Sequence, residues 1–235
     1  ERLNKRQPQK AAKPKPQKKA APTVDAKEEV KQFISRPKTQ LLEILCLHGD
    51  RQTAEIFRGR LVHLIKKLRP IAKLTFIDAP HELALEEGQA VPVRTWFQGE
   101  DDGGEAALAV VAEAWQDQVY DAVLGFSSGA AVAALVAQRA SCFEALQSAV
   151  LVGAPKPYGF EARVAMPSLH LCGRKDTCVP AEESKALAAL FEDATVLEHG
   201  GGHEVPSKAR EMDAVRSFLE EQAKLVQERQ PAPKK

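Results

Sequence analysis

The 235-residue sequence lacks several features that would define its class at once. It has no run of about 18 apolar residues, so we expect no membrane-spanning helix. Its four cysteines lie far apart without a Cys-x-x-Cys pair, which argues against a zinc ribbon or a thioredoxin-type motif. No His, Asp and Glu cluster has metal-site spacing, and we expect neither a metal nor a cofactor. Reduced thiols in an intracellular compartment, cytoplasm or mitochondrion, are the simplest interpretation.

The first 38 residues are poor in acidic side chains. They carry 12 Lys and Arg against 4 Asp and Glu, whereas the remainder carries 21 against 28. Residues 1–24 hold too little apolar surface to offset the entropy of ordering. Three interpretations of residues 1–38 stay open: an intrinsically disordered tail, the remnant of an organellar targeting segment, or an arm that binds RNA or an acidic protein surface.

From residue 39 onward, short apolar runs alternate with segments of helical periodicity. The runs predict buried strands at 41–47, 74–77, 121–124, 149–152, 168–172 and 195–198. Helical spacing of apolar residues predicts helices at 51–69, 105–119, 128–139, 181–191 and 207–228. This alternation predicts the α/β class over residues 39–228: a mostly parallel sheet of about six strands, covered by helices on both faces. Residues 229–235 are expected to form a C-terminal tail.

Residues 78–103 show no clear period and are rich in Pro, Gly and acidic side chains. We expect a long loop here, and therefore one wall of a pocket. Trp96 and Phe97 lie in this loop. They are candidates either to line the pocket or to pack against the body.

The sequence Gly125-Phe126-Ser127-Ser128-Gly129 follows a predicted strand and precedes a predicted helix. This is the context of the nucleophile elbow, in which a serine occupies a tight strand-to-helix turn. The free N–H groups of the following helix then point to the position where an oxyanion forms. An ordinary Gly/Ser turn would give the same five residues, so the pattern needs support from elsewhere in the chain.

That support comes from two later loops. Asp176 follows the predicted strand at 168–172, and His203 lies in a glycine-rich loop after the strand at 195–198. Each is also typical of a solvated loop, but the order Ser127, Asp176, His203 is that of α/β-hydrolases. We therefore predict a triad in which His203 takes the Ser127 proton and Asp176 orients the imidazole.

Two backbone N–H groups are candidates for the oxyanion hole. The N–H of Ser128 follows the nucleophile directly, and a second donor is expected from the loop after the first body strand. We assign it to Asp50, with Arg51 as the alternative. His48 in the same loop is a candidate pocket residue, and its role as a brace of the loop is favoured over that of a metal ligand.

Six segments, in order across about residues 41–220, resemble the FSH-type serine hydrolases. They are Leu45–Gly49, Ile77–Pro80, Arg94–Phe97, Gly125–Ala130, Gly173–Asp176 with Val179 and Pro180, and His199–Pro206. The resemblance implies a compact α/β-hydrolase that cleaves small carboxylic esters, with Ser127, Asp176 and His203 as its triad. An active esterase or thioesterase of this type is the first hypothesis.

Two positions depart from the pattern of that family. Ser128 stands where the family usually has Gln, and Asp50 stands where it usually has a bulky apolar residue. A carboxylate of Asp50 that faced the pocket would oppose the developing oxyanion. The alternative hypothesis is a structural subunit of a large assembly, such as an organellar ribosome, which keeps the hydrolase fold and is tethered by residues 1–38.

Overall fold

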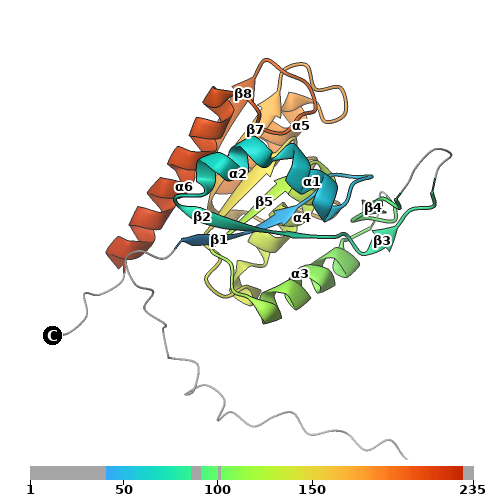
Figure 1. Ribbon diagram of the computed structural model, residues 1–235, viewed down its shortest axis with the longest axis horizontal. Coiled ribbons are helices and arrows are strands. Elements are labelled where there is room, and N and C mark those ends of the chain that lie inside the picture. The colour runs from blue at the N-terminus through green and yellow to red at the C-terminus, as the bar shows by residue number, and fades with distance from the viewer. Residues whose placement is uncertain (1–40, 86–90, 100–101, 230–235) are drawn as a thin grey trace, which may run out of the picture. The chain divides into compact units, whose positions relative to one another are not determined.

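The computed structural model describes residues 41–85, 91–99 and 102–229 (Figure 1). The interpretations of residues 1–38 and nearly all of the predicted tail lie outside the described residues. The elements follow in the order β1 (Leu42–Leu47), α1 (Ala54–Arg60), α2 (Val62–Leu68), β2 (Ala72–Ile77), β3 (His81–Glu82), β4 (Arg94–Thr95), α3 (Glu105–Asp117), β5 (Ala122–Phe126), α4 (Ser128–Gln138), a short 3₁₀ turn (Ala140–Cys142), β6 (Ser148–Val152), β7 (Val164–Gly173), α5 (Ala181–Ala188), β8 (Phe191–His199) and α6 (Ala209–Arg229).

The predicted helix at 51–69 departs from the expected elements. It is two helices, α1 and α2, which meet at Leu61 with φ −92° and ψ 11°. Gly59 in the last turn of α1 weakens the helix there, because glycine loses more backbone entropy than other residues in a helix. The predicted loop at 78–103 also contains the short antiparallel pair of β3 and β4.

Six strands form one sheet in the order β2-β1-β5-β6-β7-β8, and each pairs with its neighbours in parallel. The prediction of a mostly parallel sheet of about six strands is therefore confirmed. The chain runs outward from β1 to β2 and then returns to the other side of β1 with β5. Such a switch in direction opens a crevice at the carboxyl ends of the two strands, which is where ligands bind in open α/β sheets.

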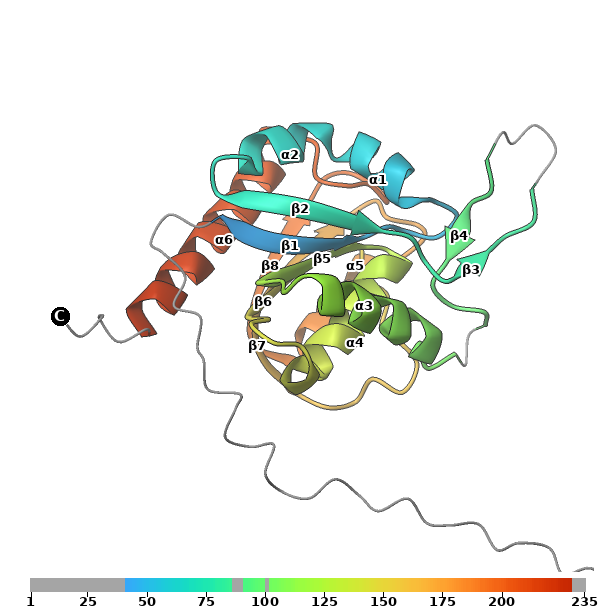
Figure 2. The ribbon, with the colours of Figure 1, turned by 60° about the horizontal axis from the view of Figure 1, so that its bottom comes forward.

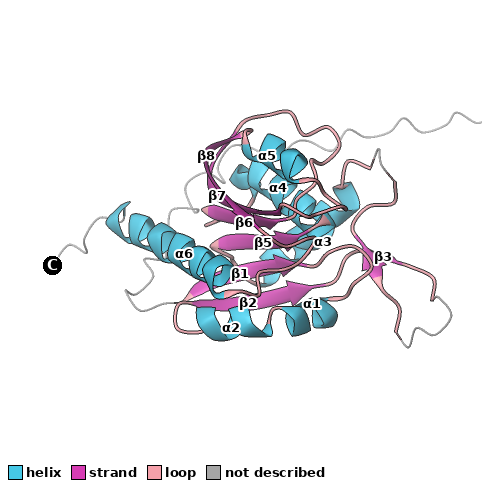
Figure 3. Cartoon of the chain, turned by 90° about the horizontal axis from the view of Figure 1, so that it is seen from above, coloured by secondary structure: helices cyan, strands magenta, loops and turns pink. Residues whose placement is uncertain are grey.

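Helices cover both faces of the sheet, as Figures 2 and 3 show. Alternate residues of β1 point to opposite faces, as in any strand. Leu45 and Leu47 pack with residues of α3, α4 and α5, whereas Ile44 and Cys46 pack with residues of α1, α2 and α6. The near-continuous apolar run of β1 thus follows from burial on both faces.

The helix α4 follows the predicted elbow and is buried from Gly129 to Ala137. Its residues there are Gly, Ala, Val and Leu, five of them alanines, so the helix approaches the sheet closely. This burial fixes the N-terminal end of α4 against β1 and β5, and with it the position of the residue that precedes the helix.

Cys46 and Cys172 are buried on β1 and β7, as their place in apolar strands predicted. Burial raises the pKa of both thiols, so both remain protonated packing residues. Cys142 and Cys178 are exposed. Among the residues described, no helix combines the length and the apolar character that a membrane crossing requires.

His170, buried on β7, gives the fold a predictable dependence on pH. Its Nε2 lies 3.0 Å from the Ser168 hydroxyl, and burial lowers its pKa to about 4. In the unfolded chain its pKa is about 6.5, so between these values the unfolded state binds a proton that the folded state does not. Acidification from pH 7 to pH 5 should therefore lower the free energy of unfolding by about 2 kcal/mol through this residue.

Urea unfolding at the two pH values measures this loss. His170→Gln keeps a partner for Ser168 but does not titrate, so its pH dependence should be smaller by about that amount. The control is His63→Gln, at an exposed position of α2, which should keep the wild-type dependence. An equal loss in His170→Gln and in the wild type would contradict the assignment to His170.

Candidate active site

Ser127 lies between β5 and α4 in a backbone conformation that is unusual for a residue with a side chain. Its φ is 54° and its ψ is −124°. Such a conformation costs on the order of 1–3 kcal/mol and persists only where the surroundings enforce it. Here its N–H donates to the Val152 carbonyl (2.9 Å), and its own carbonyl accepts from Ala130 N–H (2.8 Å). The turn therefore holds Ser127 at the carboxyl end of β5, beside the crevice.

Two glycines make this turn possible. A methyl group at Gly129 would overlap the carbonyl oxygens of His48 and Leu47, and one at Gly125 would lie 2.5 Å from Ala130 Cα. The first turn of α4 therefore rests directly on the backbone of β1 and β5. This contact is the physical reason for the small residues on either side of Ser127.

Ser127, His203 and Asp176 form one chain of hydrogen bonds. His203 Nε2 accepts from the Ser127 hydroxyl (2.9 Å), and His203 Nδ1–H donates to Asp176 Oδ2 (2.7 Å). The other carboxylate oxygen, Oδ1, accepts from the N–H groups of Cys178 (2.9 Å) and Val179 (2.8 Å). The Asp176 side chain is only 1% exposed, so these bonds fix the carboxylate, and through it the imidazole.

The loop that carries His203 is held by backbone contacts. Arg174 N–H donates to the His199 carbonyl and Lys175 N–H to the Gly201 carbonyl, both at 2.9 Å. The ring of Phe126 lies 4.8 Å from the ring of His203, centre to centre. The glycine-rich sequence at 200–202 thus serves as a closely packed connection between β8 and His203.

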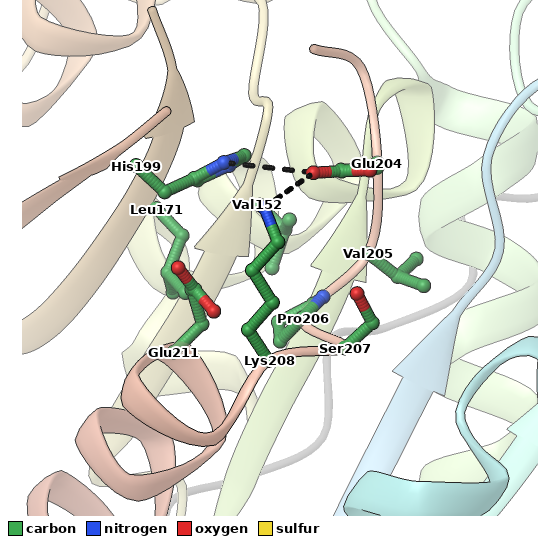
Figure 4. Close-up of a pocket in the computed structure, with 9 residues that line it drawn as sticks. All are labelled: Val152, Leu171, His199, Glu204, Val205, Pro206, Ser207, Lys208 and Glu211. Atoms are coloured by element: carbon green, nitrogen blue, oxygen red, sulfur yellow. Dashed lines mark ion pairs between the residues drawn. The ribbon is translucent and has the colours of Figure 1, made fainter. Parts of the chain in front are cut away.

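A small cavity lies behind this loop, next to Glu204 (Figure 4). Glu204 Oε1 is 3.9 Å from both His199 Nδ1 and Lys208 Nζ. The cavity measures about 10 Å³, enough for a single water molecule and far too small for a substrate. His199 is buried and its Nδ1 accepts from Gly201 N–H (3.2 Å), so it supports the loop.

His48 and Trp96 are not among the residues that line the large pocket described below, so the expected pocket role of His48 requires correction, whereas Trp96 takes its other expected role and packs against the body. Both are fully buried. His48 Nδ1–H donates to the Gly49 carbonyl (2.7 Å), and its Nε2 accepts from Ala79 N–H (3.0 Å). Trp96 Nε1–H donates to the His48 carbonyl (2.7 Å). Burial lowers the pKa of His48, so a neutral imidazole braces the loop that follows β1.

The loop after β1 turns at Arg51, whose φ is 56°. Asp50 is exposed and is not among the residues that line the large pocket described below. The carbonyl of Gln52 accepts from Arg94 N–H (2.8 Å), which ties the loop to β4. The assignment of Asp50 and Ser128 as oxyanion donors stays a prediction.

A pocket of about 270 Å³ opens beside the elbow. Phe97 lines it, which was one of the two alternatives for that residue. The predicted loop at 78–103 supplies one wall of the pocket. The lining residues come from this loop, from α4 and from the segment after β6: Phe97, Gly99, Asp102, Ser128, Ala131, Pro155, Lys156, Pro157 and Tyr158.

The wall at 155–158 was missed by sequence reasoning. Its signal is the run Gly153-Ala154-Pro155-Lys156-Pro157, a turn-rich stretch directly after β6. Because β6 neighbours β5, a loop at its carboxyl end must lie beside the elbow. In the described parts of the chain, no three His, Cys, Asp or Glu side chains gather into a group that could hold a metal ion.

The fold and the arrangement of its site define an α/β-hydrolase with a serine at the nucleophile elbow. A family model described as "Serine hydrolase (FSH1)" matches residues 38–215, and the chain belongs to this family. The resemblance inferred from six short segments is therefore confirmed.

Curated relatives carry the name esterase. Esterase CG5412 of Drosophila melanogaster is 33% identical over 217 residues, which cover 81% of this chain and 78% of that protein. Esterase OVCA2 of Mus musculus is 33% identical over 218 residues, which cover 77% of this chain and 97% of that protein. The chain is thus an enzyme of the hydrolase class, by its family and its relatives.

Solved structures agree on the fold. Esterase PE8 aligns with a TM-score of 0.61 at 21% identity, over 77% of this chain and 92% of its own. A Bacillus cereus carboxylesterase aligns with a TM-score of 0.59 at 20% identity, over 78% and 89%. The comparisons lend no support to the alternative of a structural subunit, or to an RNA or protein partner of residues 1–38.

Proposed function

We propose that the protein is a serine hydrolase of carboxylic esters or thioesters, and that Ser127 forms an acyl-enzyme. The observation that carries this proposal is the hydrogen-bond chain from the Ser127 hydroxyl through His203 to Asp176, at an elbow with φ 54°. The relatives named as esterases support an ester as the substrate class.

The mechanism follows from the direction of these hydrogen bonds. His203 Nε2 takes the proton of Ser127 Oγ as the oxygen attacks the ester carbonyl, and it then delivers that proton to the leaving oxygen or sulfur. Asp176 accepts the Nδ1–H, and its negative charge stabilises the imidazolium. The two N–H groups on its other oxygen hold the carboxylate in position and favour its ionised form. Water then attacks the acyl-enzyme by the same proton path, which releases the acid and restores Ser127.

The developing oxyanion would be met by the N–H groups of Ser128 and Asp50. Ser128 N–H lies at the start of α4, where the free N–H groups and the positive end of the helix dipole favour negative charge. Loss of one such donor typically lowers kcat about 100- to 1,000-fold. An intracellular compartment is part of the proposal, because all four cysteines are free thiols.

A fluorophosphonate probe tests the proposal directly, because it forms a stable bond only with an activated serine. The folded wild-type chain should gain the mass of one adduct, located at Ser127 by peptide mapping. Ser127→Ala should gain none, and Ser141→Ala, at an exposed serine after α4, should label as the wild type does. A folded wild-type chain that stays unlabelled would overturn the proposal.

A further inference from the structure

The peptide group between Gly49 and Asp50 is held in one orientation by the side chain that precedes it. His48 Nδ1–H donates to the Gly49 carbonyl (2.7 Å). A peptide group is planar and trans, so its C=O and N–H bonds point in opposite directions. The bond from His48 therefore directs the Asp50 N–H away from the imidazole. In the described part of the chain this N–H donates to no backbone carbonyl, which leaves it able to meet a negatively charged oxygen.

The imidazole of His48 is itself fixed in one orientation. Its Nε2 accepts from Ala79 N–H (3.0 Å), so the proton of the neutral ring lies on Nδ1, where it faces the Gly49 carbonyl. A ring turned by about 180° would place carbon atoms at both positions and lose both hydrogen bonds. The side chain is fully buried, and its ring centre lies 5.1 Å from that of Trp96, which leaves it little room to turn.

The backbone carbonyl of His48 contacts the start of α4. A methyl group at Gly129 would overlap this oxygen, so the first turn of the helix rests on it. Trp96 Nε1–H donates to the same oxygen (2.7 Å) and holds it in place. The first turn of α4 also carries the N–H of Ser128, the other expected donor to the oxyanion.

One residue thus sets the position of both expected donors. The imidazole of His48 directs the Asp50 N–H, and its carbonyl supports the turn that carries the Ser128 N–H. Two donors serve one oxyanion only if both lie about 2.7–3.1 Å from the position of that oxygen. Donors that are held in advance need no reorganisation when the charge develops, and this is the source of their effect on the rate.

Resting on the proposed function, we infer that His48 is a positioning residue of the reaction, whose imidazole and carbonyl together hold the N–H groups of Asp50 and Ser128 at the oxyanion. Trp96 supports it through the indole N–H. The oxyanion develops only as the reaction proceeds, so loss of this arrangement lowers kcat and leaves KM nearly unchanged. A residue that merely filled the core would change the free energy of unfolding and leave the kcat of the folded protein as it is.

Two amide replacements of His48 test the role of the imidazole. His48→Asn places an amide nitrogen near the position of Nδ1 and keeps a donor for the Gly49 carbonyl. His48→Gln places an amide oxygen near the position of Nε2 and keeps only the acceptor for Ala79 N–H. With p-nitrophenyl butyrate, His48→Gln should lower kcat about 100-fold and His48→Asn less than about 10-fold, with KM changed less than about threefold in both. An equal or larger loss of kcat in His48→Asn would overturn the inference.

A pair of tryptophan variants tests the support of the His48 carbonyl, and decides the matter where a His48 variant does not fold. Trp96→Phe removes the indole N–H and keeps an aromatic ring, and it should lower kcat about 10-fold at unchanged KM, because a displacement of 1 Å costs about 100-fold and a smaller one costs less. Trp115→Phe is the matched control. Trp115 Nε1–H donates to the Glu144 carbonyl (3.0 Å), so this variant loses the same type of bond and should keep the wild-type kcat. Equal kcat in the two variants would contradict the inference.

The wild-type chain separates this inference from the proposed function. If it hydrolyses the ester and takes up the fluorophosphonate at Ser127, while His48→Gln or Trp96→Phe retains the full kcat, the inference fails alone. If the folded wild type neither hydrolyses the ester nor takes up the probe, the inference fails together with the proposed function.

Discussion

Replacing Ser127 with alanine is expected to lower kcat about a million-fold, with p-nitrophenyl butyrate as substrate. In the proposed mechanism the hydroxyl oxygen is the atom that attacks, and the hydrogen bond to His203 Nε2 activates it. Residues of a triad act as a unit, so His203→Ala should lose about as much and the double variant hardly more. Steady-state rates of the four proteins measure this non-additivity.

The strained backbone of Ser127 provides a second readout. Glycine adopts φ near 54° without penalty, so Ser127→Gly should be as inactive as Ser127→Ala but more resistant to urea than the wild type. Ser141→Ala should match the wild type in both measurements. If either Ser127 variant retained activity within about 100-fold of the wild type, a different residue would have to be the nucleophile.

Much of this site could be predicted from the sequence, because parallel strands bring their carboxyl ends to one edge. Ser127, Asp176 and His203 each follow an apolar run of strand length, and the structure joins them through bonds of 2.9 and 2.7 Å. The prediction of these three residues did not depend on any periodicity within the loops that carry them. The order of the residues and the ends of three strands were sufficient.

The remaining residues depend on contacts that no local pattern encodes. Trp96 and Phe97 are neighbours in one loop, yet Trp96 is fully buried against the His48 carbonyl while Phe97 lines the pocket. Outside a regular strand, alternation does not predict which neighbour turns inward. Likewise, no pattern in the sequence indicates that the Ser128 hydroxyl has no hydrogen-bond partner among the described residues.

Replacing Gly129 with alanine is expected to disrupt the start of α4. The added carbon would overlap the carbonyl oxygens of His48 and Leu47, and these are backbone atoms that cannot rotate away. The start of α4 must then move off β1, which costs on the order of 3 kcal/mol or more out of a total stability of about 5–15 kcal/mol. A displacement of about 1 Å at Ser127 should lower kcat at least 100-fold in the fraction that still folds.

Gly59→Ala is the matched control, because the same methyl group meets nothing within 4 Å there. Gly59 lies in the helix α1, so alanine should raise the free energy of unfolding by about 0.5–1 kcal/mol and leave kcat as in the wild type. Urea unfolding and steady-state kinetics of both variants measure the contrast. Alanine at position 129 overlaps backbone atoms of the folded protein, whereas alanine at position 59 only lowers the conformational entropy of the unfolded chain. The two substitutions should therefore change the free energy of unfolding in opposite directions. Equal stability of Gly129→Ala and the wild type would mean that α4 does not rest on β1, and the support of the elbow would have to be sought elsewhere.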